Sequence, residues 1–103
     1  MNLKFLKFWN NPSNKIKRRI QYKALSIILY SYNQKDPVKK ESNIYGLDLN
    51  GNILWNAENC NSGRYFDMQI DETNNTLEAQ DGSGMFYEIE LKEGKIIREE
   101  LRK

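Results

Sequence analysis

A repeat with a period of about 42 residues constrains the fold of this chain more than any other feature of its sequence. Three apolar residues and one acid recur 42 positions apart, pairing Tyr45 with Tyr87, Leu47 with Ile89, Asp48 with Glu90 and Leu49 with Leu91. After a one-residue insertion at the turn that follows, the repeat continues 43 positions apart, pairing Gly51 with Gly94, Ile53 with Ile96 and Leu54 with Ile97. A repeat of this kind indicates two structural units of similar design.

Each unit has the pattern of strands joined by tight turns. Apolar and polar residues alternate over residues 44–49 and 85–91, which is the period of two that a half-buried strand needs. Asn50-Gly51 and Glu93-Gly94 then supply the residue types of tight hairpin turns. Upstream, residues 65–70 alternate, 71–75 have turn composition, 76–81 form a strand and 82–84 form another turn. We therefore expect a four-stranded meander from about residue 64 to residue 101.

The first unit is less regular. Residues 24–32 are one long run of strand formers, and residues 34–42, with Pro37, form a polar connection in which a strand has been lost or shortened. We assign residues 23–58 to this unit and residues 64–101 to the second. Residues 1–22 form a basic N-terminal segment, in which Ser13 can cap a helix that places Ile16, Ile20 and Ala24 on one face. The apolar residues near the start of the chain are expected to cover an open end of the sheets.

A period in the low forties with four strands per unit is the spacing of β-propeller blades. The 103 residues form a single domain, which has room for only two such blades. A closed ring takes roughly four to eight blades, so the chain either oligomerises or remains open. Its small size favours the open form. The sequence predicts an all-β, open half-propeller of two antiparallel meander blades with a short N-terminal helix or cap.

Composition excludes several functions. The chain has no histidine and one cysteine, which rules out a disulfide framework, a Cys/His zinc site and imidazole-based catalysis. The calcium-like stretch at residues 71–82 lacks the glycine expected at its sixth position and ends in Gly82 instead of a glutamate, so no metal or other cofactor is expected. Cys60 has no base beside it and is expected to be an idle thiol. Without a secretory cleavage pattern or a membrane span, we expect a cytoplasmic protein.

Charge is unevenly distributed along the chain. Residues 1–40 carry ten Lys or Arg and one acid, for a net charge of +9. Residues 41–93 carry eleven acids and two basic residues, for −9, and residues 94–103 return +2. Regions of one sign attract surfaces of the other, so this asymmetry indicates a charged partner.

The stretch at residues 44–55 resembles the repeat of quinoprotein-type propeller blades, in which a strand ending in Leu-Asp is followed by a glycine turn and a strand ending in Leu-Trp. In its size, repeat and charge, the two-blade chain resembles the half-propeller immunity proteins of contact-dependent growth inhibition systems. Some of the toxins in these systems have a ribonuclease A-like fold. The resemblance implies a non-enzymatic inhibitor that binds its cognate toxin 1:1 and covers the active site. It supplies no residue-level binding motif.

The residues themselves indicate where such a partner would bind. A nuclease is basic where it holds phosphates, so its inhibitor benefits from carboxylates at that place. Alternation turns four acids away from the core, and three more lie at turns that we expect at one end of the same sheet. Nearby aromatic residues would serve as anchors. The predicted contact residues are Tyr65, Asp67, Asp71, Glu72, Glu78, Asp81, Phe86, Glu88 and Glu90.

Three alternatives remain open. The same acids could simply keep strand faces solvated, and Tyr65 and Phe86 could pack under the N-terminal segment. The basic front could bind nucleic acid through Lys15, Lys17, Arg18, Arg19, Tyr22 and Lys23, although an acidic sheet behind it would repel a polyanion. Residues 1–9 could dock on a membrane surface, but their apolar positions do not alternate regularly with their lysines.

Overall fold

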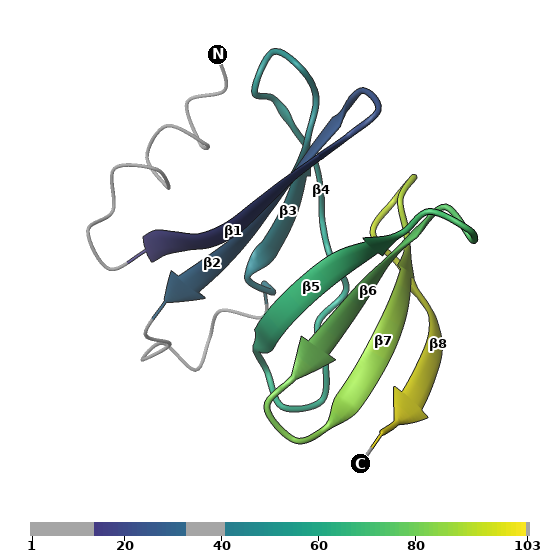
Figure 1. The fold of residues 1–103 in the computed structure, drawn as a ribbon. Coiled ribbons are helices and arrows are strands. Elements are labelled where there is room, and N and C mark those ends of the chain that lie inside the picture. The colour runs from purple at the N-terminus through teal and green to yellow at the C-terminus, as the bar shows by residue number, and fades with distance from the viewer. Residues whose placement is uncertain (1–13, 33–40, 103) are drawn as a thin grey trace.

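The computed structural model describes residues 14–32 and 41–102 and contains two four-stranded antiparallel sheets, as Figure 1 shows. The all-β prediction is confirmed. In each sheet the strands lie in sequence order, so each sheet is a meander. The first sheet consists of β1 (Asn14–Tyr22), β2 (Leu25–Tyr32), β3 (Ile44–Leu47) and β4 (Ile53–Asn56). The second consists of β5 (Tyr65–Asp71), β6 (Thr76–Asp81), β7 (Met85–Glu90) and β8 (Ile96–Leu101).

The second sheet agrees with the predicted meander strand by strand. The internal repeat also recurs in the turns, because Asp48 and Glu90 have the same role in the two units. The Asp48 carboxylate accepts the backbone N–H groups of Asn50 and Asn52 in the β3–β4 turn, both at 2.9 Å. The Glu90 carboxylate accepts those of Glu93 and Lys95 in the β7–β8 turn, at 2.8 and 2.9 Å. The repeat therefore preserves turn chemistry as well as apolar spacing.

The start of the described chain differs from the prediction. Asn14–Tyr22 forms strand β1, paired with β2, and not the helix predicted to begin at Ser13. A β-bulge between Ile16 and Arg18 shifts the alternation, so Ile16 packs against one face of the first sheet and Ile20 against the other. The first sheet therefore keeps four strands, because β1 supplies the one that seemed lost from residues 34–42. A helix or cap within residues 1–13 would lie outside the described residues.

One apolar core joins the two sheets. Ile27, Leu29 and Ile44 from the first sheet pack with Leu77 and Ile89 from the second, and all five are fully buried. Burial on this scale supplies most of the free energy that holds the sheets together. In Figure 1 the two sheets lie beside one another, and β5 contacts both β1 and β2.

Two side chains reinforce this junction. Asn43 is buried and donates hydrogen bonds to the carbonyl groups of Tyr30 and Tyr65, while its own side-chain oxygen accepts from the Tyr65 N–H. Trp55 extends from β4, donates its indole N–H to the Leu91 carbonyl and packs against Gly94. Both contacts connect residues far apart in the sequence, so they fix how the sheets meet.

The remaining two sheet faces differ in character. On the first sheet, Ile28, Tyr30, Tyr45 and Leu47 form a second apolar cluster that is at most 5% exposed. On the second sheet, the face opposite the shared core carries mainly polar and charged side chains, among them Asp67, Gln69, Glu78 and Glu88. We call this face of the second sheet the outer face. None of the described residues belongs to a helix long and apolar enough to cross a membrane.

Candidate functional site

Two cross-strand rows of side chains form the centre of the outer face, because residues paired across antiparallel strands point to the same side. The first row runs from β5 to β8 through Asp67, Gln80, Phe86 and Glu100. The second row runs through Gln69, Glu78, Glu88 and Arg98. Four predicted contact residues, Asp67, Glu78, Phe86 and Glu88, therefore lie on one surface.

Arginines from the C-terminal end neutralise part of this charge. Arg102 binds both oxygens of the Glu78 carboxylate, at 2.9 and 3.2 Å, and its guanidinium lies 4.2 Å from the centre of the Phe86 ring. Arg102 also donates a hydrogen bond to Glu100. These hydrogen bonds raise the pKa of Arg102, and the bonds to Glu78 have the larger effect. Arg98 pairs with Glu88 at 3.3 Å. The two rows carry four carboxylates against three arginines, Arg98, Arg102 and Arg18 from β1, so the face keeps an excess of one carboxylate.

A like-charge pair lies at the middle of the face. Glu78 on β6 and Glu88 on β7 stand directly opposite each other, an arrangement that costs stability between neighbouring strands. Their side chains are both 19% exposed, and each is also held by a neighbour, Gln69 for Glu78 and Thr76 for Glu88. Arg102 binds Glu78 and Arg98 binds Glu88, so the two arginines offset this repulsion. The pair therefore depends on arginine side chains that are 40% and 65% exposed.

Three further predicted acids lie at one end of the second sheet. Asp71 accepts the backbone N–H of Asn74 in the β5–β6 turn, and Glu72 is exposed in the same turn. Glu90 lies at the same end, because Asp71 and Glu90 both pair with Thr76. Asp71 and Glu90 therefore accept hydrogen bonds from the backbone of the turns that follow them, and Glu72 is the acid of this group that is exposed.

Tyr65 is not a surface residue, which corrects its prediction as an aromatic anchor. It is 2% exposed, packs edge-on against Tyr87 and donates its hydroxyl to the Glu58 carbonyl. The cause is a β-bulge between Tyr65 and Asp67, which inserts one extra residue and reverses the alternation upstream of it. Phe66, which a strict period of two would bury, is 53% exposed instead.

Asp81 also differs from its predicted place. It is 4% exposed and lies at the end of β6, at the opposite end of the sheet from Asp71 and Glu72. Its carboxylate accepts the N–H and hydroxyl of Ser83 and the hydroxyl of Tyr87. Burial is the main cause that raises the pKa of Tyr87 to about 12, and the Asp81 carboxylate adds to it. Asp81 is therefore a structural residue and not a contact residue.

These turn carboxylates predict how stability depends on pH. Hydrogen bonds from Asn52 and Asn74 lower the pKa of Asp48 and Asp71; at Asp81 and Glu90 burial raises the pKa, but hydrogen bonds outweigh it and lower the pKa overall. A carboxyl group with a lowered folded-state pKa stabilises the fold above its unfolded pKa, and this contribution is lost as the pH falls through the folded pKa. The free energy of unfolding should therefore be constant above about pH 5 and fall progressively below it.

Urea unfolding of Asp81→Asn across this pH range tests the assignment. The variant should lose about 1–2 kcal/mol at pH 7, and the difference from the parent protein should shrink at acidic pH, where Asp81 is protonated in both states. Glu72→Gln is the control and should leave the curve unchanged, because Glu72 makes no hydrogen bond or ion pair within the described residues. A difference that stays constant down to strongly acidic pH would show that the Asp81 carboxylate does not contribute to the pH dependence of stability.

The basic residues near the start of the described chain make separate contacts with the second sheet. Lys17, the extra residue of the β1 bulge, donates its ammonium to the Phe66 carbonyl and lies 3.5 Å from the centre of the Phe66 ring. Arg18 faces Asp67 at 3.7 Å. Tyr22 and Lys23 both donate to the side-chain oxygen of Asn75 in the β5–β6 turn. These contacts connect β1 and Lys23 to the second sheet, and they engage four of the six residues named in the nucleic-acid hypothesis.

Within residues 14–32 and 41–102, no group of three or more His, Cys, Asp or Glu is placed to hold a metal ion. Cys60 is buried, with its sulfur 3.5 Å from the Ser62 hydroxyl oxygen. The segment considered for membrane docking, residues 1–9, lies outside the described residues, as does the side chain of Lys15.

Five residues of the outer face escaped the sequence-based prediction of contact residues. They are Gln69, Gln80, Arg98, Glu100 and Arg102. A signal for the last three was present, because a period of two along β8 places Arg98, Glu100 and Arg102 on the side of Phe86 and Glu88. The approach of Arg18 from the other sheet had no sequence signal.

Comparison with known proteins identifies a family without a known activity. A family model described as a domain of unknown function (DUF7957) matches residues 12–101, which includes all eight strands. No curated protein and no solved structure matches the chain.

Proposed function

This chain belongs to the domain of unknown function (DUF7957) family, and we propose that it is a cytoplasmic immunity protein with a half-propeller fold. In this proposal it binds a cognate antibacterial toxin, a basic nuclease such as an RNase, and covers the active site. It acts by binding alone, as a monomer in a 1:1 complex and without a cofactor.

The architecture supports the half-propeller interpretation. Each sheet is a four-stranded meander, which is the form of a propeller blade. The first strands of the two sheets, β1 and β5, lie against each other, as innermost strands do around a propeller axis. Two blades leave the ring open, so one blade face at each end lacks a neighbouring blade.

The two unmatched faces favour a monomer over a ring closed by a second copy. Closure would press the outer face of one copy onto the far face of the first sheet in the other. The apolar side chains there, including Ile28 and Tyr30, are already buried within one chain. Among the described residues, that face therefore offers little exposed apolar surface, and the outer face remains available to a different partner.

The acidic excess of the outer face, centred on the Glu78 and Glu88 pair, is the observation that carries the proposed function. The site of a nuclease that holds a phosphate backbone is lined by Lys and Arg. Phe86 lies beside the carboxylates and supplies the aromatic element that interface centres favour. The pairs made by Arg98 and Arg102 are exposed to solvent and contribute little to stability, so cations of a partner can replace them.

Co-purification followed by a growth assay tests the proposal. The protein is expressed as bait in its source cell, washed at low and high salt, and its partners are identified by mass spectrometry. We expect one basic protein domain that inhibits growth when it is expressed alone and becomes harmless when it is expressed together with this chain. Recovery of RNA at low salt would support the nucleic-acid alternative, and a captured domain that stays toxic would contradict the proposal.

A further inference from the structure

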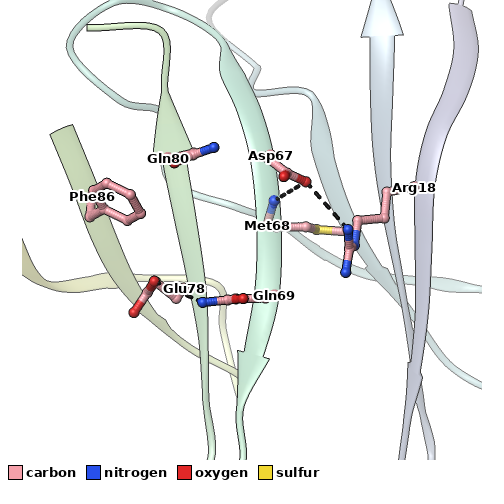
Figure 2. Close-up of a pocket in the computed structure, with 7 residues that line it drawn as sticks. All are labelled: Arg18, Asp67, Met68, Gln69, Glu78, Gln80 and Phe86. Carbon is pink, nitrogen blue, oxygen red and sulfur yellow. Dashed lines mark hydrogen bonds and ion pairs between the residues drawn. The ribbon is translucent and has the colours of Figure 1, made fainter. Parts of the chain in front are cut away.

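A small pocket opens on the outer face where β1 approaches β5. It has a volume of about 110 Å³ and is shown in Figure 2. Sites for small organic ligands usually measure about 300–1,000 Å³, so this pocket suits a single side-chain group better than a whole metabolite. The residues that line it are Arg18, Asp67, Met68, Gln69, Glu78, Gln80 and Phe86.

The lining offers hydrogen-bond acceptors around an aromatic ring. Asp67 contributes a carboxylate, Glu78 contributes a carboxylate that Arg102 and Gln69 already bind, and Gln80 contributes a side-chain amide that lies between Asp67 and Phe86 in Figure 2. One oxygen of Asp67 accepts the Met68 N–H at 2.9 Å, and its other oxygen accepts no hydrogen bond within the described part of the chain. This set of groups is suited to a cation with several donors.

Two arginines of this chain already contact residues that line the pocket, which indicates that the lining binds guanidinium groups. Arg18 reaches the pocket from β1 and stands 3.7 Å from Asp67, with both side chains more than two-fifths exposed. Arg102 stacks on Phe86 and binds Glu78 in the bidentate geometry that a planar guanidinium favours. The contact of Arg18 is long and solvated, so its removal costs little.

We propose that this pocket receives the guanidinium group of an arginine from the protein partner, and that Arg18 occupies the Asp67 end of the pocket until the partner arrives. This inference rests on the proposed function, since it names the group of the partner that the outer face recognises. Arginine fits better than lysine because its planar fork serves several acceptors at once and stacks on aromatic rings.

Titration with an arginine side chain alone tests the pocket without the partner. N-acetyl-L-arginine amide is added to the full ¹⁵N-labelled chain, and N-acetyl-L-citrulline amide, its uncharged isostere, is the matched probe. The arginine probe should cause saturable NMR shifts at the Met68 and Gln69 amides and the Gln80 side chain, with a dissociation constant on the order of millimolar or weaker. The citrulline probe should cause none. Absence of saturable shifts with the arginine probe, or equal shifts with both probes, would overturn the proposal.

Two variants should move the affinity in opposite directions. Asp67→Asn should weaken binding of the arginine probe roughly two- to fivefold, and Arg18→Gln should strengthen it by a similar factor because a competing cation is removed. Glu72→Gln, which changes the same charge outside the pocket, should have no effect. Arg18→Gln with unchanged or weaker probe binding would contradict the role given to Arg18.

The two proposals fail in distinguishable ways. If the arginine probe binds as expected but no toxin is captured, the proposed function fails and the pocket stands. If a toxin is captured and neutralised, but the probe does not bind and Asp67→Asn retains full affinity for the toxin, the pocket fails and the proposed function stands.

Discussion

Trp55→Ala is expected to lower the free energy of unfolding by about 3–5 kcal/mol, the range typical of large aromatic residues removed from a core. Trp55 is 6% exposed and connects the end of the first sheet to the β7–β8 hairpin of the second. The variant would leave a cavity between the two sheets. It would also leave the Leu91 carbonyl without the indole N–H that donates to it. Urea unfolding followed by circular dichroism measures the loss.

Gly94→Ala tests the same contact from the other side. A Cβ at Gly94 would lie 2.7 Å from the Trp55 ring, and the residue has a φ of +76°, which favours glycine. Gly51→Ala is the matched control, because Gly51 also has a positive φ but a Cβ there would meet no neighbouring atom within 4 Å among the described residues. Gly94→Ala should be clearly more destabilising than Gly51→Ala. Equal losses at the two glycines, or a loss below about 1 kcal/mol in Trp55→Ala, would show that this contact does not hold the sheets together.

The second large effect is expected at Asn43. Asn43→Ala should cost about 3–5 kcal/mol, because it leaves the Tyr30 carbonyl and both backbone groups of Tyr65 buried without their side-chain partner, at about 1–3 kcal/mol for each unsatisfied group. Asn52→Ala is the control, since Asn52 donates its side chain only to Asp48 in a surface turn. Urea unfolding of both variants measures the difference. Similar losses for Asn43→Ala and Asn52→Ala would contradict the role of Asn43 as the polar bridge between the sheets.

The second sheet was predictable from the sequence because most of its strand residues follow a period of two and its turns contain glycine or asparagine. The prediction was wrong where a bulge interrupts that period. The bulge beside Phe66 buried Tyr65, and the bulge at Lys17 placed Ile16 and Ile20 on opposite faces of a strand, whereas their spacing of four also fits a helix. A bulge is a tertiary compromise between neighbouring strands and has no short sequence pattern of its own.

The candidate site was predicted in part for a related reason. Alternation correctly placed Asp67, Glu78, Phe86 and Glu88 on one face. It could not place Arg18 beside Asp67, because that contact depends on how two strands from different sheets pack together. Asp81 was predicted to lie at the surface, yet the Asp-Gly-Ser-Gly turn that begins with it is a recognisable pattern for a carboxylate that binds its own turn.

The central claim is that the outer face of the second sheet binds the toxin, and calorimetric titration of the captured domain tests it most directly. Glu88→Lys/Glu100→Lys reverses two charges on this face and avoids Glu90, which its own turn requires. Glu93→Lys/Glu99→Lys makes the same change in net charge away from the face, because Glu93 lies in a turn and Glu99 pairs with buried Tyr87. We expect the first variant to lose at least about tenfold in affinity, mainly through faster dissociation, and the second to bind like the parent protein. Equal affinities for the two variants would show that the toxin binds elsewhere.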